Sequence, residues 1–365
     1  MKPVKKNILC VMGTRPEAIK MAPVVRALKA CTNINCRVLV TAQHRQMLDQ
    51  ILKVFDIKPD IDLDIMRPNQ ALTALTARLL LKLEPILQAE KPDVVLAQGD
   101  TTTVMTIALA CFYQQIPFGH IEAGLRTGDI SSPFPEEMNR VVASRLTQWH
   151  FAPTRKARQN LLQEGIPDAD IWVTGNTVID ALKTVASQPP EIGVNLDETK
   201  RLILVTAHRR ENFGVPLRNI CNALLKLLQN NQDIQLLFPV HPNRNVEMIV
   251  TEMLDGHPRA ILCPPLDYLP FIAAMQRAFL ILSDSGGVQE EAPALGKPVL
   301  VLRNKTERPE AVAAGVVKLV GHDDEKIVAA AQCLLDDPCA YRQMAQAVSP
   351  YGDGRAAGRI VKVIV

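Results

Sequence analysis

Three carboxylates in the first half of the chain stand at or near the ends of apolar runs. Asp100 comes just after the run Asp93–Gln98, Glu122 follows Pro117–Ile121, and Glu136 opens a helical pattern. Asp100 has an equal alternative as an N-cap, because Asp is a favoured capping residue, and a first-turn Glu136 would complement the helix dipole. Three carboxylates at such ends are harder to explain by capping and dipole effects than one would be, so acid–base catalysis stands beside those alternatives.

A glycine-rich turn in the second half has the features of a phosphate site. The residues Ser283-Asp284-Ser285-Gly286-Gly287 stand between a buried-strand pattern and a helical pattern. Glycines let a ligand approach the backbone, a helix N-terminus offers free N–H groups, and Ser285 adds a hydroxyl. Glu291 lies four residues after Gly287, about 5.4 Å further along a helix, and is predicted to accept from ribose hydroxyls. The alternative is an ordinary glycine-rich turn followed by a solvated pair of glutamates.

Basic residues accompany both groups. Arg15 and Lys20 flank the start of the first predicted helix, where a cation would stand at the edge of a ligand site. Ordinary surface positions are the alternative for both. His208 ends an expected strand and is followed by Arg209 and Arg210. One His and two Arg on a loop can clamp an anion.

The elements that position these residues alternate along the chain. We expect strands over Ile8–Met12, Arg37–Thr41, Asp93–Gln98, Pro117–Ile121, Leu202–Ala207, Ile234–Val240, Phe279–Ser283 and Pro298–Leu302. We expect helices over Pro16–Lys29, Leu72–Leu87, Thr101–Tyr113, Pro135–Leu146, Pro216–Leu228, Tyr268–Gln276 and Gly287–Leu295. The polar segment Ser187–Lys200 separates two such runs. This rhythm predicts an α/β fold with two doubly wound Rossmann-like domains facing a cleft, in which ligands bind at the carboxyl ends of the strands.

Composition excludes several classes of protein. A net charge of +3 in 365 residues is too small for a nucleic-acid footprint. The start of the chain lacks a signal-peptide pattern and no apolar run is long enough to span a bilayer, so we expect a cytoplasmic protein without nucleic-acid or membrane partners. The eight cysteines form no CxxC pair, and we expect buried free thiols. GxGxxG, Walker A and HExxH motifs are absent, so we expect no cofactor and no metal.

Ordered motifs along nearly the whole chain resemble the non-hydrolysing UDP-N-acetylglucosamine 2-epimerases of bacteria. In the first half they are Gly13-Thr14-Arg15-Pro16-Glu17-Ala18-Ile19-Lys20, Gln43-His44-Arg45, Gly99-Asp100-Thr101-Thr102-Thr103, Glu122-Ala123-Gly124-Leu125-Arg126-Thr127 and Thr174-Gly175-Asn176-Thr177. In the second half they are His208-Arg209-Arg210-Glu211-Asn212, Asp284-Ser285-Gly286-Gly287, Thr306-Glu307-Arg308-Pro309-Glu310 and Pro350-Tyr351-Gly352-Asp353-Gly354.

The resemblance implies a GT-B-like pair of domains and a homodimer. The last helix would cross back, so that residues 1–170 with 352–365 form one domain and residues 171–351 the other. The resemblance implies catalytic roles for Asp100, Glu122, Glu136 and His208. Substrate binding is assigned to Arg15, Lys20, Phe271, Ser285, Gly286, Gly287, Glu291 and Arg308. Some members bind a second UDP-GlcNAc as an activator, at positions that match Gln43, Gln46, Arg210 and His241. The loop at Asn69 differs from members that carry a basic residue there, which leaves this regulation open.

The implied reaction interconverts UDP-GlcNAc and UDP-ManNAc, for surface polysaccharide precursors. The C2–H bond is not acidic, because no carbonyl is adjacent to it. Loss of UDP from C1 would acidify that proton and give a glycal, to which UDP re-adds. Positive groups would stabilise the departing diphosphate, and carboxylates would move the proton. The alternatives are a hydrolysing 2-epimerase, a 2-epimerase of a modified UDP-sugar, a GT-B glycosyltransferase and a non-enzymatic nucleotide sensor.

Overall fold

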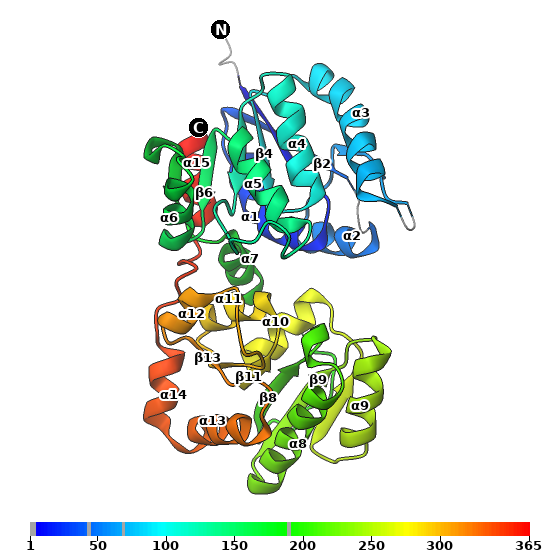
Figure 1. The fold of residues 1–365 in the computed structure, drawn as a ribbon, viewed down its shortest axis with the longest axis vertical. Coiled ribbons are helices and arrows are strands. Elements are labelled where there is room, and N and C mark those ends of the chain that lie inside the picture. Colours follow the sequence, from blue (N-terminus) through cyan, green and yellow to red (C-terminus); the bar gives the residue numbers. More distant parts are fainter. Residues whose placement is uncertain (1–4, 42–44, 68–69, 188–190) are drawn as a thin grey trace. The chain divides into compact units, whose positions relative to one another are not determined.

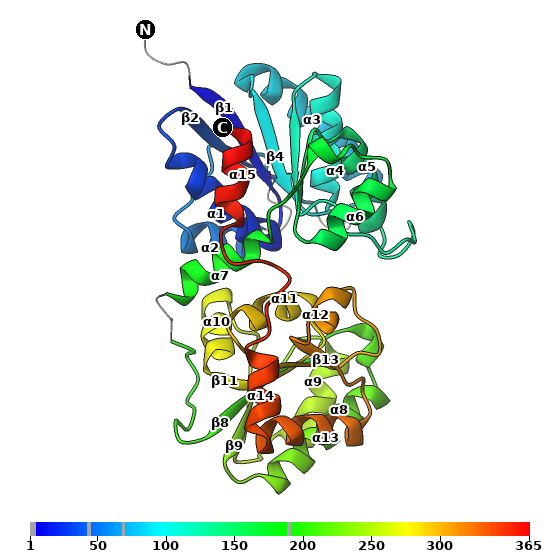
Figure 2. The same cartoon turned by 90° about the vertical axis from the view of Figure 1, so that its left-hand side faces the viewer.

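The chain folds into two compact units. The computed structural model describes residues 5–41, 45–67, 70–187 and 191–365, with only the backbone of residues 45 and 46. The first unit comprises residues 1–181 and 351–365, and the second comprises residues 182–350. Figures 1 and 2 show a twisted sheet with its own helices in each unit. No helix within the described ranges is long and apolar enough to cross a membrane.

The first unit is built on a seven-stranded parallel sheet with the order β3-β2-β1-β4-β5-β6-β7. Its strands are β1 (Lys6–Met12), β2 (Ile34–Val40), β3 (Ile61–Asp62), β4 (Val94–Gln98), β5 (Phe118–Ile121), β6 (Trp149–Ala152) and β7 (Ile171–Val173). The chain proceeds outward from β1 in one direction and then from β4 in the other. Such a reversal of strand order is where doubly wound folds place their ligands.

The helices of the first unit pack on both faces of this sheet. They are α1 (Arg15–Lys29), α2 (Arg45–Val54), α3 (Leu72–Glu90), α4 (Thr102–Tyr113), α5 (Glu136–Leu146), α6 (Arg155–Gln163) and α15 (Ala356–Ile364). A further helix, α7 (Thr177–Ala186), contains residue 181, where the first unit ends. The C-terminal helix α15 lies beside α1 on one face, and α3, α4 and α5 cover the other (Figure 2). The C-terminal helix therefore belongs to the first unit, as expected.

Local sequence explains where the helices next to the predicted site begin. Thr14 and Glu17 form a capping box at the start of α1, and Pro16 occupies its first turn, where its missing N–H costs no helical hydrogen bond. Thr101 caps α4 by accepting from the N–H of Val104. Both helices therefore start no more than four residues after the last residue of the strand before them. The residues in these short turns are held at the carboxyl edge of the sheet.

The second unit is built on a six-stranded parallel sheet with the order β10-β9-β8-β11-β12-β13. Its strands are β8 (Arg201–Thr206), β9 (Ile234–Pro239), β10 (Ala260–Cys263), β11 (Ala278–Ser283), β12 (Val299–Val301) and β13 (Val317–Leu319). Its helices are α8 (Val215–Asn230), α9 (Arg244–Leu254), α10 (Tyr268–Arg277), α11 (Gly286–Ala294), α12 (Pro309–Ala313), α13 (Asp324–Asp336) and α14 (Pro338–Ala345). One apolar cluster, drawn only from this unit, forms a core between α8, α9, α13 and the sheet.

The predicted α/β class with two parallel sheets is confirmed, and two details are corrected. We expected the first domain to end at residue 170. However, β7 pairs with β6 from His150↔Ile171 to Ala152↔Val173, so the first sheet continues beyond that point and the compact unit runs to residue 181. All eight cysteines are free thiols, and Cys10, Cys111 and Cys221 are buried, but Cys31, Cys36 and Cys263 are half-buried and Cys333 and Cys339 are exposed.

Candidate active site

A buried glutamate joins the turn just before α1 to the turn that carries Asp100. Glu17 Oε2 accepts from the backbone N–H groups of Gly13 at 2.6 Å and Thr14 at 2.7 Å. Its Oε1 accepts from the Thr101 hydroxyl at 2.5 Å. Burial raises the pKa of the Glu17 carboxyl, and these hydrogen bonds oppose the rise. One side chain thus fixes the turn after β1 against the turn after β4.

Asp100 is held by an arginine of α5 and is not a helix cap. Its Oδ2 accepts from Arg140 Nε at 2.9 Å and Nη2 at 2.7 Å, and its backbone carbonyl accepts from the Asn139 amide at 2.8 Å. Thr101 provides the cap of α4, so the capping alternative for Asp100 is wrong. Both bonds are charge-assisted and end on the same oxygen, so Arg140 fixes the position of that oxygen.

Arg140 is a site residue that the sequence analysis missed. It also donates to Glu137 at 2.7 Å, three residues earlier on α5. Glu137 is buried and accepts from the backbone N–H groups of Thr127 and Gly128. The spacing of Glu137 and Arg140, three residues apart on one helix, is a signal for the pair. No local pattern could show that Arg140 reaches Asp100.

Glu122 is the most tightly held carboxylate of the first unit. Its backbone has φ +66°, a conformation that is uncommon for a residue with a Cβ. Lys20 Nζ donates to both carboxylate oxygens, at 2.6 and 2.8 Å. The amides of Asn176, at 2.8 Å, and of Gln98 also donate to it. The surface alternative for Lys20 is therefore wrong, since its amine is bound to a carboxylate that is itself buried.

Arg15 and Glu136 lie at the first residues of α1 and α5. Both are half-buried. Glu136 stands where it complements the dipole of α5, and its neighbour Glu137 takes the buried position. Their predicted roles in substrate binding and catalysis remain predictions.

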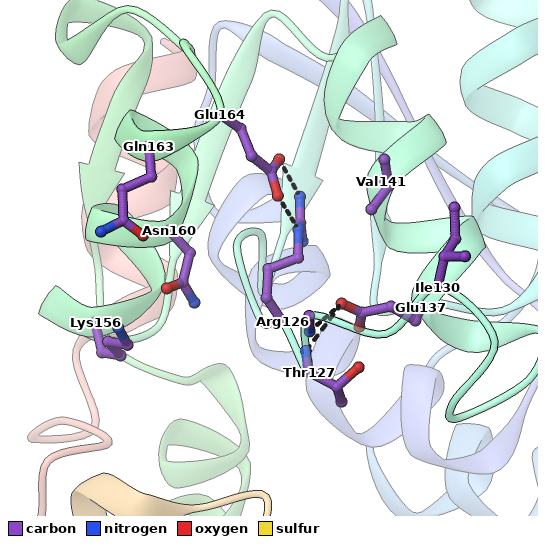
Figure 3. Close-up of a pocket in the computed structure, with 10 residues that line it drawn as sticks. Arg126, Thr127, Ile130, Glu137, Val141, Lys156, Asn160, Gln163 and Glu164 are labelled. Atoms are coloured by element: carbon purple, nitrogen blue, oxygen red, sulfur yellow. Dashed lines mark hydrogen bonds and ion pairs between the residues drawn. The ribbon is translucent and has the colours of Figure 1, made fainter.

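The arginine of the motif that begins at Glu122 serves the fold. Arg126 donates to both carboxylate oxygens of Glu164, at 2.6 and 2.9 Å, and to the Ser144 hydroxyl at 2.9 Å. It thereby ties the end of α6 to α5. A pocket of about 560 Å³ lies in front of this ion pair, with Lys156, Asn160 and Gln163 of α6 on one side and Val141 of α5 on the other (Figure 3). The pocket contains none of the predicted site residues.

In the second unit, a buried aspartate connects the glycine-rich turn to the loop after β8. Asp284 is fully buried. Its Oδ2 accepts from the backbone N–H groups of His208 and Arg209, both at 2.8 Å, and from the Asn212 amide at 2.9 Å. Its Oδ1 lies 3.2 Å from His208 Nδ1. These contacts fix the loop that carries His208 against the glycine-rich turn.

The imidazole of His208 is partly buried beside the carboxylate of Asp284. Burial lowers the pKa of its imidazole, and the charge of Asp284 acts in the opposite direction. The imidazole is therefore neutral near pH 7. The negative charge of Asp284 would stabilise the imidazolium formed by proton uptake. The ring stacks on His241, with centroids 5.8 Å apart.

The glycine-rich turn leads directly into a helix, as predicted. Ser283 ends β11, Ser285 is the N-cap of α11, and Gly286 is its first residue. The side chain of Ser285 makes no capping hydrogen bond. A Cβ added at Gly286 or Gly287 would meet no atom closer than 3.8 Å, and neither glycine is among the residues with positive φ. The fold therefore does not require glycine at these positions, whereas close approach of a ligand would.

The remaining predicted residues of the second unit lie on α10 and α11, at the N-cap of α12, and in the segments that follow β8 and β9. Glu291 lies on α11 and is half-buried, and the adjacent Glu290 is buried and accepts from Arg308 Nε. Phe271 is half-buried on α10. Of the predicted regulatory positions, Arg210 is the exposed first residue of a short 3-10 helix (Arg210–Asn212), and His241 is an exposed loop residue. Gln43 and Asn69 lie outside the described residues, as does the side chain of Gln46.

Two parallel sheets with their helices define a class of protein, the GT-B-like α/β proteins with two Rossmann-type units. The solved structure of the glycotransferase of kitacinnamycin shares this fold, with a TM-score of 0.65 over 99% of both chains. At 11% identity this similarity shows the fold alone.

Sequence similarity then shows the family. Residues 26–365 match the family described as UDP-N-acetylglucosamine 2-epimerase. The chain is 54% identical to UDP-N-acetylglucosamine 2-epimerase of Yersinia pestis over 98% of both chains. It is 48% identical to UDP-GlcNAc 2-epimerase from Neisseria meningitidis, whose crystal structure was solved bound to UDP-GlcNAc. The two structures match over 98% of this chain and 99% of the Neisseria chain, with a TM-score of 0.88. The chain therefore belongs to the UDP-N-acetylglucosamine 2-epimerase family.

Proposed function

We propose that this protein interconverts UDP-GlcNAc and UDP-ManNAc by inversion at C2, without releasing free sugar. Two ion pairs, Asp100–Arg140 and Glu122–Lys20, carry the proposal. They lie in a chain that matches the 2-epimerase family over nearly its whole length. The Neisseria meningitidis relative is bound to UDP-GlcNAc, which supports a UDP-sugar as substrate.

The chemistry begins at C1 of the sugar. The C1–O bond to UDP breaks, and UDP leaves with the electron pair. A carboxylate takes the C2 proton, the C–H electrons form the C1=C2 bond, and a glycal results. A proton returns to C2 on the opposite face, the oxygen of UDP bonds to C1 again, and the epimer is complete. Substrate and product are isomers and the C2 proton is only removed and replaced, so the reaction consumes no redox partner.

The two units divide these tasks. In the second unit, the turn Ser285–Gly287 holds the diphosphate with backbone N–H groups, Glu291 accepts from the ribose hydroxyls, and His208 and Arg308 stabilise the departing charge. In the first unit, Asp100, Glu122 and Glu136 remove and return the proton, and Arg15 and Lys20 contribute positive charge. Arg140 joins the residues predicted from sequence, because it holds Asp100 in place.

An incubation in D2O tests the reaction. UDP-GlcNAc is added to the protein, and the sugar is followed by NMR. Deuterium at C2 of both epimers with UDP still attached is the expected result. Free sugar together with UDP would show a hydrolysing epimerase instead. An unchanged substrate would contradict the proposed activity.

Amide variants test the carboxylates. Asp100→Asn, Glu122→Gln and Glu136→Gln are each expected to lower kcat by about 100-fold or more, since a missing proton-transfer group typically costs about 10²–10⁴. Affinity for UDP should change little. Asp255→Asn, at an exposed position of the second unit, is the control and should keep full activity. A variant with near-normal kcat would remove that residue from the catalytic set.

The ribose role of Glu291 has a separate test. Glu291→Ala should weaken UDP binding in calorimetry, because the carboxylate no longer accepts from the ribose hydroxyls. Unchanged affinity would contradict that role while leaving the carboxylates of the first unit untouched.

A further inference from the structure

Glu122 is held by donors from three different elements. Lys20 comes from α1, Gln98 ends β4, and Asn176 stands between β7 and α7. Glu122 itself has φ +66°. Strain of this kind persists only where surrounding contacts over-determine the conformation, and it is concentrated at functional sites. The two amide donors have no role in the reaction described above, so their purpose is open.

Asn176 has two tasks that fix the orientation of its amide. Its Oδ1 accepts from the backbone N–H of Val178 at 3.1 Å and so caps α7. Its Nδ2 donates to Glu122 Oε1 at 2.8 Å. An amide oxygen only accepts and an amide nitrogen only donates. Because the oxygen is committed to the helix, the nitrogen must face Glu122.

The backbone around Asn176 is fixed by the C-terminal segment. The N–H of Asn176 donates to the carbonyl of Tyr351 at 2.7 Å. Gly175, with φ +90°, packs so closely that an added Cβ would lie 3.3 Å from that carbonyl oxygen and 3.4 Å from Gly352 Cα. Asn176 is itself buried. Its side chain therefore has little freedom to leave the carboxylate.

We propose that Asn176 is a positioning residue, which together with Gln98 and Lys20 keeps Glu122 ionised and correctly oriented for proton transfer. Hydrogen bonds to the charged form favour that form, and charge-assisted bonds are the strong ones. This inference rests on the proposed function, because it assigns Asn176 to the carboxylate that acts on the sugar.

Asn176→Asp separates positioning from capping. Aspartate has nearly the same shape, and its oxygen still accepts from Val178, so α7 keeps a good cap. Aspartate cannot donate a hydrogen bond to Glu122, and its negative charge repels the negative charge of Glu122. We expect kcat to fall about 10- to 100-fold, the usual weight of a hydrogen bond to a charged group, with UDP affinity unchanged. The acid limb of the pH–kcat profile should move to higher pH, because a neighbouring like charge disfavours an ionised carboxylate.

Two further variants guard this test against loss of folding. Serine is a favoured, uncharged cap, but its side chain is too short to contact Glu122. For Asn176→Ser, kcat should therefore fall about tenfold, while the unfolding temperature stays near that of the wild type. Asn243→Asp makes the same substitution at the cap of α9, where the side chain accepts from Asn245 N–H. It should leave kcat and the pH profile unchanged.

A double variant tests the contact without any activity measurement. If the carboxylate introduced by Asn176→Asp faces Glu122, the unfolding temperature of this variant should rise when Glu122→Gln is added, because the repulsion is removed and an amide donor is supplied. Wild-type kcat and an unmoved acid limb in Asn176→Asp would overturn the positioning role, as would a missing recovery in the double variant. A wild-type protein that fails to exchange deuterium at C2 would instead overturn the proposed function, and the thermal cycle would still report on the contact.

Discussion

At the scale of single residues, Glu17 shows how a buried carboxylate can shape a site without entering the chemistry. It accepts from two backbone N–H groups and one hydroxyl. Gln in its place keeps one oxygen for both N–H groups, and its amide can donate to the Thr101 hydroxyl, which accepts as well as donates. Glu17→Gln should therefore retain the arrangement of the two loops, whereas Glu17→Ala should lose about 1 kcal/mol for each lost bond.

The pH dependence of these two variants follows from the same carboxyl. Burial raises the pKa of Glu17 in the folded protein, so its contribution to stability is complete below the ordinary value of about 4.3. That contribution is lost as pH rises through the raised pKa. Gln does not titrate. In urea unfolding, the free energy of unfolding of Glu17→Gln should rise relative to that of the wild type between pH 4 and pH 8. A difference in free energy that is the same at both pH values would contradict the burial effect.

His208 provides the opposite case. Burial lowers the pKa of its imidazole, so the ring signal in an NMR titration should have its midpoint below the free value of about 6.5. Asp284→Asn should lower that midpoint further, because the opposing charge is removed. The contribution of His208 to stability is present above the ordinary value and is lost as pH falls through the lowered pKa. His208→Asn assigns the signal, and a midpoint above the free value would contradict the dominance of burial.

At the scale of elements, the start of α11 separates ligand binding from folding. Gly286→Ala adds a Cβ that meets no atom closer than 3.8 Å, and Ala is the better helix former by up to about 1 kcal/mol. The free energy of unfolding should therefore stay equal or rise. UDP affinity should fall, because the methyl group occupies the surface that a diphosphate would approach.

A glycine that the fold does require is the matched control. Gly124 has φ +89°, and an added Cβ would lie 2.3 Å from the carbonyl oxygen of Ala157, so Gly124→Ala should lower the free energy of unfolding measured in urea. Calorimetry with UDP completes the comparison. If Gly286→Ala bound UDP as tightly as the wild type, the turn would have no part in holding the diphosphate.

The elements were more predictable from sequence than the contacts between them. Apolar runs located β1, β4, β8 and β11, because buried parallel strands read as continuous hydrophobic segments. The turn residues that follow them were therefore placed correctly at the strand ends. The partners of Glu122 and Asp100 were missed, since 54 residues separate Asn176 from Glu122 and 40 separate Arg140 from Asp100. Periodicity and propensity act over a few residues, and only the folded sheet brings such pairs together.

At the scale of the whole molecule, the first unit is discontinuous in sequence and needs the end of the chain. Lys6 Nζ donates to the Ile364 carbonyl at 2.6 Å, and α15 buries Ile360, Val361 and Ile364. Asp180 accepts from the N–H groups of Ala356 and Ala357 at 3.1 and 2.9 Å. It thus caps a helix that lies 176 residues further along the chain.

Truncation after residue 354 should therefore destabilise one unit and spare the other. The loss of three buried aliphatic side chains, each worth about 1.5–3 kcal/mol, is a large share of the stability of a domain. Trp149 and Trp172 are the two tryptophans of the chain, and both stand in strands of the first sheet. Tryptophan fluorescence therefore reports unfolding of the first unit alone, while the core of the second unit contains only residues from its own range. In the truncated chain, the fluorescence transition should move to lower urea concentration. The circular-dichroism transition that belongs to the second unit should stay at the same urea concentration. Removal of Val365 alone, which is 52% exposed, is the control and should leave both transitions unchanged. Equal shifts of the two transitions in the truncated chain would contradict two separate cores.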